Sequence, residues 1–92
     1  MTRVERTVTV INTQGLHARP SALVVKTAVR FRSELRLCRE GSTADAKSMI
    51  EVMMLACPKG SVLKVCADGV DASAALDAID ALFRSGFDEA YG

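Results

Sequence analysis

The sequence predicts an α+β fold, a two-layer open-faced sandwich in the order β-α-β-β-α-β-α, with a four-stranded antiparallel sheet and three helices on one face. Three observations support this prediction. Short β-branched or alternating segments indicate strands, apolar residues at helical spacing indicate helices, and glycine or proline marks most connections. A chain of 92 residues suffices for one small core, so we expect a single domain over residues 1–92.

Four segments have the alternation or the β-branched composition of strands. The first contains Thr7-Val8-Thr9-Val10-Ile11, and the second alternates around Leu35 and Leu37. A turn with Gly41 joins the second strand to a short third strand, as in a tight hairpin. The predicted strands span residues 6–11, 33–39, 42–45 and 62–67.

Three segments have the apolar spacing of helices. The predicted helices span residues 18–31 and 49–55, and the last one begins after Asp71 as its N-cap and ends at Gly86. Residues 87–92 then form a tail. The first helix is expected to bury one face, which consists of Ala22, Leu23, Val25, Ala28 and Val29.

The composition is that of an ordinary globular protein, with 49% hydrophobic and 25% charged residues. No apolar run approaches the roughly 20 residues that span a bilayer, and residues 1–6 lack the apolar core of a signal peptide. We therefore expect a cytoplasmic monomer without membrane insertion. Cys38, Cys57 and Cys66 form no C-x-x-C pair, so we expect buried free thiols, no metal site and no cofactor.

The charges are unevenly distributed, although the formal net charge is only +1. Residues 17–39 are mainly basic and residues 68–92 mainly acidic, which favours an acidic protein partner near the basic part. With aromatic residues at 4%, the sequence argues against nucleic acid binding. Arg19, Lys26 and Arg30 form a stripe that is either a solvated helix face or a docking surface.

The stretch Gly15-Leu16-His17-Ala18-Arg19-Pro20 contains the only histidine of the chain. Proline fits the first turn of a helix, so His17 is expected at a helix N-terminus, where free amides favour an anion over a cation. Arg19 adds a forked guanidinium that suits phosphate. The stretch therefore predicts a histidine that accepts a phosphoryl group. The alternative is a structural domain in which His17 only caps the helix.

A second stretch, residues 47–56, predicts a short and largely apolar helix. Ser48 and Glu51 have the spacing of a capping box, so Ser48 is expected to start this helix. Val52 and Leu55 are expected in the core. Because a small domain cannot bury every face of a peripheral helix, its other apolar side chains favour a partner-binding patch.

Residues 15–21 and 47–56 together resemble the active-site and regulatory-serine segments of the histidine-containing phosphocarrier (HPr) family of the bacterial sugar phosphotransferase system. The resemblance implies this same fold and a carrier that is not itself an enzyme. His17 would accept a phosphoryl group on Nδ1 from enzyme I, charged by phosphoenolpyruvate, and pass it to IIA components of sugar permeases. Arg19 would assist. The implied docking residues are Leu16, Ser21, Lys26, Met49, Ile50 and Met53.

The resemblance also implies that an HPr kinase/phosphorylase phosphorylates Ser48. This chain departs from many family members with a regulated serine, because Glu51 stands where they have glycine, and its charge would repel a phosphoserine. That departure leaves open the nitrogen-related branch of the family, in which phosphorylation controls partner proteins and does not serve sugar uptake. An interaction module of that kind is the alternative function.

Overall fold

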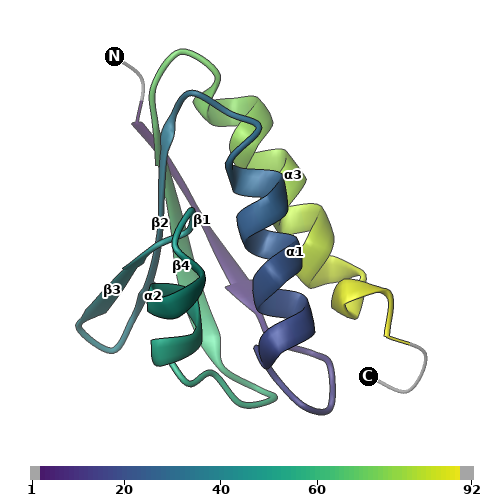
Figure 1. The fold of residues 1–92 in the computed structure, drawn as a ribbon. Helices are drawn as coiled ribbons and strands as arrows, with labels where there is room; N and C mark the ends of the chain where they lie inside the picture. The colour runs from purple at the N-terminus through teal and green to yellow at the C-terminus, as the bar shows by residue number, and fades with distance from the viewer. Residues whose placement is uncertain (1–2, 90–92) are drawn as a thin grey trace.

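The computed structural model describes residues 3–89 and confirms the expected order of elements (Figure 1). One tight hairpin, between β2 and β3, and two helical connections, through α1 and α2, link the four strands into one sheet. The elements are β1 (Arg3–Thr9), α1 (Ala18–Ala28), β2 (Glu34–Arg39), β3 (Ser42–Asp45), α2 (Met49–Met54), β4 (Val62–Asp68), α3 (Ala72–Arg84) and the 3₁₀ turn η1 (Gly86–Asp88).

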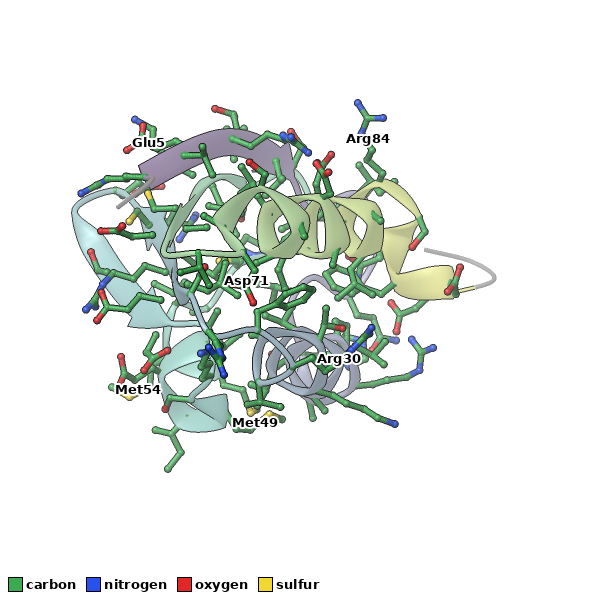
Figure 2. The ribbon with its side chains drawn as sticks, turned by 90° about the horizontal axis from the view of Figure 1, so that it is seen from above. Glu5, Arg30, Met49, Met54, Asp71 and Arg84 are labelled. Atoms are coloured by element: carbon green, nitrogen blue, oxygen red, sulfur yellow. The ribbon has the colours of Figure 1, made fainter. Side chains whose placement is uncertain are left out.

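The sheet has the strand order β1-β4-β2-β3, and every adjacent pair is antiparallel. The helices cover one of its faces, which confirms the predicted open-faced sandwich (Figures 1 and 2). Alternation along the strands explains the two faces, because Leu35 and Leu37 of β2 are buried whereas Arg36 between them is exposed. A two-residue turn, Glu40-Gly41, has positive φ at both positions and closes the predicted hairpin.

The core lies between the sheet and the helices. Phe83 of α3 and Phe87 of η1 are both fully buried, and their rings meet edge to face with centroids 5.0 Å apart. Val52 and Leu55 are buried as expected. The core therefore includes residues beyond the end of α3.

The buried face of α1 differs from the prediction. Ala28 is buried as expected, but Ala22 and Val29 are exposed, and Pro20, Ser21 and Val24 are buried instead. The helix also ends at Ala28 and not at residue 31, because the backbone there tightens into i→i−3 bonds such as Phe31 N–H to the Ala28 carbonyl, 3.1 Å. The stripe with i,i+4 spacing from Pro20 to Ala28 is the one that faces the core.

The C-terminal segment corrects two further predictions. The supposed tail is ordered through Glu89, since Gly86, Phe87 and Asp88 form a left-handed turn that buries Phe87; residues 90–92 lie outside the described residues. Asp71 does precede α3, but its side chain makes no cap bond there. Its carboxylate accepts from the Arg32 and Ser33 amides, both at 2.9 Å, and so fixes the α1–β2 connection.

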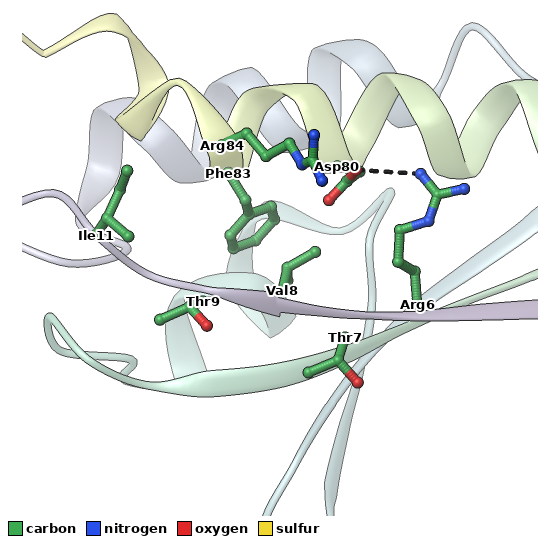
Figure 3. A pocket seen from close by; sticks show the side chains of 8 residues that line it. All are labelled: Arg6, Thr7, Val8, Thr9, Ile11, Asp80, Phe83 and Arg84. Carbon is green, nitrogen blue, oxygen red and sulfur yellow. Dashed lines mark hydrogen bonds and ion pairs between the residues drawn. The ribbon is translucent and has the colours of Figure 1, made fainter.

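A surface pocket of about 390 Å³ lies between β1 and α3 (Figure 3). Its rim is an ion-paired seam, in which Arg6 contacts Asp77 at 2.9 Å and Asp80 at 3.1 Å, and Arg84 contacts Asp80 at 3.4 Å. The two Arg6 pairs join the edge strand β1 to α3, whereas the Arg84–Asp80 pair lies within α3. Since these arginines are at least partly exposed and already paired with carboxylates, the seam adds little free energy of its own and is part of the packing of α3 on β1.

Candidate functional site

The loop before α1 is held rigidly against the segment that follows α2. Gly15 has φ of +67°, and a Cβ added to it would lie 2.2 Å from the Cys57 carbonyl oxygen. The Leu16 amide donates to that same carbonyl at 2.9 Å. A glycine is therefore required at position 15 both by conformation and by space, and the loop delivers the next residues to a fixed position.

His17 is the N-cap residue of α1, with φ −77° and ψ −168°, and its carbonyl accepts the first helical bond from the Ser21 amide at 3.0 Å. No side chain in the described part of the chain caps this helix. The amides of Ala18 and Arg19 lie in the first turn, where they have no partner within the helix, and the His17 side chain makes no cap bond to them. We call these two amides the open N-terminus of α1, and it is a suitable place for an anion.

Glu89 completes the site from the far end of the chain. Its Oε2 lies 2.9 Å from His17 Nε2, and its Oε1 accepts from Asn12 Nδ2 at 2.8 Å. The Asn12 hydrogen bond, followed by His17 and Arg19, lowers the pKa of the Glu89 carboxyl. An ionised carboxylate only accepts, so Nε2 of a neutral His17 carries the proton and Nδ1 carries the lone pair.

Arg19 is anchored by the same segment. Its Nη1 donates to the Phe87 carbonyl at 2.9 Å and to Glu89 Oε2 at 3.3 Å, and about half of its side chain remains exposed. The guanidinium and the imidazole thus share one carboxylate oxygen. The two predicted site residues lie together, as the motif indicated.

The sequence analysis missed Asn12 and Glu89. Asn12 is fully buried, and besides Glu89 it donates to the Gly15 carbonyl at 2.7 Å. Its position in a polar loop gave only a weak signal for a role, and Glu89 lay in a segment that was interpreted as a tail. Both act through contacts that span the chain, 77 residues in the case of Asn12 and Glu89.

Ser48 begins α2 as predicted. Its hydroxyl oxygen accepts from the Glu51 amide at 3.3 Å, which is the forward half of a capping box. The Glu51 carboxylate makes a different bond, since it accepts from the Asp45 amide at 3.0 Å. The serine hydroxyl is half-buried and its oxygen is already in use as a cap.

The expected docking residues separate into two groups. Ile50 and Met53 are 70% and 43% exposed, Met54 beside them is 77% exposed, and Lys26 is exposed on the adjoining helix α1. Met49 is partly buried on the side of α2 toward α1 (Figure 2). We call Ile50, Met53 and Met54 the α2 patch.

Leu16 and Ser21 are corrections to the predicted docking set. Leu16 is 5% exposed and belongs to the core. Ser21 is fully buried, and its hydroxyl donates to the Leu16 carbonyl at 3.1 Å. Their side chains hold the loop on α1 and offer no surface to a partner.

Cys57 and Cys66 are buried free thiols as expected, whereas Cys38 is only partly buried. Burial raises the pKa of the Cys57 thiol, which keeps it unreactive. Residues 3–89 contain no group of three His, Cys, Asp or Glu side chains placed to hold a metal ion. Within the same residues, no helix is long and apolar enough to cross a membrane.

Comparisons with known proteins extend over nearly the whole chain. The family model described as "PTS HPr component phosphorylation site" matches residues 4–85. Phosphocarrier protein HPr of Treponema pallidum (strain Nichols) is 45% identical over 86 residues, 94% of this chain and 98% of the relative. Phosphocarrier protein NPr of Shewanella violacea is 40% identical over 90 residues, 98% of this chain and 99% of the relative. The crystal structure of HPr-C-His from Thermoanaerobacter tengcongensis is similar with a TM-score of 0.88 and 38% identity, covering 97% and 98% of the two chains.

These matches include the starts of α1 and α2 and all four strands. They therefore describe the whole fold and not a single motif. They define a class of protein that carries a phosphoryl group in the phosphotransferase system. The chain belongs to the HPr family of phosphocarrier proteins.

Proposed function

We propose that His17 Nδ1 is the phosphoryl acceptor, that enzyme I is the donor, and that IIA components of sugar permeases are the acceptors in turn. In each step the phosphorus–donor bond breaks as the new bond forms, and no water takes part. The observation that carries this proposal is the bond between Glu89 and Nε2 at 2.9 Å, which leaves Nδ1 as the nucleophilic nitrogen. A carrier of this kind works in the cytoplasm as a monomer.

The open N-terminus of α1 supports the phosphorylated state. A phosphoryl group carries about −1.5 to −2 charge, and the amides of Ala18 and Arg19 together with the Arg19 guanidinium are the donors nearest in sequence. Arg19 already contacts Glu89, so the new anion competes with a carboxylate for the same cation. This competition limits the stability of the phosphohistidine, which a carrier requires because it must release its cargo.

The α2 patch supports docking beside His17. Two of its side chains are more than two-thirds exposed, and methionine side chains adapt to several partners. Lys26, which is exposed on the adjoining helix α1, adds positive charge on that side. An apolar centre with basic neighbours fits the acidic partners expected from the charge distribution.

The central test is phosphotransfer from phosphoenolpyruvate and enzyme I. Wild-type protein is expected to gain an acid-labile phosphoryl group, and His17→Ala is expected to gain none while it remains folded by circular dichroism. Arg30→Ala, a charge change just beyond the end of the same helix, serves as the matched control and is expected to be labelled. Labelling of His17→Ala, or absence of label on folded wild type, would overturn the proposal.

Ser48 is proposed as a regulatory phosphorylation site for an HPr kinase/phosphorylase. A phosphate there would lie beside the α2 patch and would repel acidic partners. The Glu51 carboxylate one turn away opposes it, so Glu51→Gln is expected to be phosphorylated faster than wild type. Equal rates for the two proteins would show that Glu51 does not hinder the reaction. Absence of label on both proteins would show that Ser48 is not a phosphorylation site.

A second candidate function is that of the nitrogen-related branch. It is favoured by the matches to proteins named NPr, which at 40% and 41% identity are as similar as most relatives named HPr. The discriminating experiment offers the phosphorylated protein a sugar-permease IIA and a nitrogen-related IIA in parallel. Faster transfer to the sugar IIA supports the main proposal, and faster transfer to the other supports a regulatory role.

A further inference from the structure

Two cysteines meet on the face of the sheet that the helices leave open. In the central strand pair, Cys38 of β2 lies opposite Lys64 and Cys66 of β4 lies opposite Arg36. The two cysteines are therefore diagonal neighbours on the open face of the sheet. The strand pair between them consists of Leu37 and Val65, whose side chains point to the other face and are buried. Their sequence separation hides this proximity.

Each of the two thiols has a polar neighbour. Cys66 Sγ lies 3.6 Å from Glu5 Oε2, and Cys38 Sγ accepts from Thr43 Oγ1 at 3.8 Å. Burial, followed by the nearby Cys38 and Glu5, raises the pKa of the Cys66 thiol. The strand register and these neighbours together place the two thiols beside each other on the open face.

Solvent reaches the pair through a surface pocket of about 190 Å³ that both cysteines line. Cys38 is partly exposed and Cys66 is 8% exposed. A small polar oxidant can therefore approach Cys38 first, while Cys66 lies behind it. The third cysteine, Cys57, is 3% exposed, and neither this pocket nor the cysteine pair includes it.

We propose that Cys38 and Cys66 form a redox site that a hydroperoxide, such as hydrogen peroxide, oxidises reversibly to a disulfide. The Cys38 sulfur attacks one peroxide oxygen, the O–O bond breaks, and a sulfenic acid and one water form. The Cys66 sulfur then attacks the sulfenic sulfur, so that the S–S bond forms, the S–O bond breaks and a second water leaves. Two electrons pass from the two sulfurs to the peroxide.

The geometry indicates that this disulfide is easily reduced. Diagonal neighbours in a regular sheet have Cα atoms about 7–8 Å apart, whereas a disulfide is normally formed at no more than about 7 Å. Closing the bond therefore strains the β2–β4 pairing, and a strained disulfide is readily reopened by a dithiol. His17 lies at the start of α1 on the other side of the sheet, so phosphotransfer does not enter the reaction.

The experiment treats the full-length reduced protein with an equimolar amount of hydrogen peroxide and counts thiols in denaturant. Three thiols are expected to fall to one, the mass to fall by about 2 Da, and digestion to yield a peptide pair linked through Cys38 and Cys66. Dithiothreitol is expected to restore all three. Cys57→Ser is the matched control, because it retains the pair and is expected to form the same disulfide.

Cys38→Ser and Cys66→Ser are each expected to lose the intramolecular disulfide. The proposal is overturned if three thiols persist at a dose that oxidises free dithiothreitol, if the bond joins Cys57 or a second chain, or if Cys38 proceeds to a sulfinic acid while Cys66 stays reduced. The assay uses no phosphotransfer partner, so its failure leaves the proposed carrier function unaffected.

Discussion

The starts of α1 and α2 place two candidate phosphoacceptors in the same backbone position with opposite consequences. His17 and Ser48 are both N-cap residues with extended backbone conformations. Ser48 caps its own helix through the Glu51 amide at 3.3 Å, whereas the imidazole of His17 turns to Glu89 and leaves the N-terminus of α1 open. One helix start stabilises the fold, and the other remains available for an anion.

The difference follows from the side chains. A serine hydroxyl is short enough to reach the amide three residues ahead, so α2 satisfies its own donors. An imidazole at the same position is recruited by a carboxylate from the C-terminal end, and the helix amides stay unmet. His17 thus forgoes a cap at the helix start that is proposed to hold the transferred phosphoryl group, whereas Ser48 keeps its cap at the helix start that is proposed for regulation.

The largest effect is expected from Arg19→Ala, which removes the fixed charge from the α1 site. Loss of one preorganised donor typically costs about 10²–10³-fold in rate, so phosphoryl transfer to and from His17 is expected to fall by about 10²-fold. Stopped-flow or quench-flow transfer with enzyme I measures it. Arg30→Ala removes the same charge outside the site, and its transfer rate should stay within about threefold of the wild-type rate. Equal losses of rate in both variants would show that only the overall charge of the protein matters.

At α2, Ser48→Ala is expected to lower the free energy of unfolding by about 1 kcal/mol. The reason is loss of the bond to the Glu51 amide. Urea denaturation measures the change, and Ser48→Thr is the control because it retains a capping hydroxyl. Transfer to His17 should be unchanged; a Ser48→Ala protein as stable as wild type would show that the cap contributes nothing.

A cap can also be installed at α1. His17→Ser is expected to be more stable than His17→Ala by about 0.5–1 kcal/mol, because residue 17 already has the extended backbone of an N-cap. Both variants lack the contact with Glu89, so their difference isolates the cap. Equal stability of the two in urea would mean that the loop conformation prevents a side chain at position 17 from capping.

The start of α3 offers the most pH-dependent effect. The Ser33 hydroxyl, followed by the Arg32 amide, lowers the pKa of Asp71 to about 2. An aspartate in an unfolded chain titrates near 3.9, so this contribution is present above about pH 4 and disappears as the pH falls through about 2. Asp71→Asn should therefore flatten the acid side of the stability curve, measured by thermal melts. Asp88→Asn, at an exposed carboxylate, should leave that part of the curve unchanged.

Local interactions explain why much of the fold could be predicted. The order of the elements along the chain, the Glu40-Gly41 hairpin and the start of α2 at Ser48 all depend on residues within a few positions of each other. The same applies to His17 at the start of α1, since proline three residues later fits the first turn. The predicted face of α1 was wrong at Ala22 and Val29 and missed Val24, because the apolar residues of this helix allow two stripes, and contact with the rest of the core selects the one that contains Val24.

By itself, the sequence determined the order of the elements, the position of His17 and Arg19 at a helix start and the cap at Ser48. Only the tertiary structure decided that Glu89 contacts His17, that Asn12 holds Glu89, that Asp71 serves a distant loop and that Cys38 meets Cys66. Periodicity and capping act over a few residues and are written in short stretches. Contacts between residues 72 apart, as for His17 and Glu89, exist only after the core has brought distant segments of the chain together.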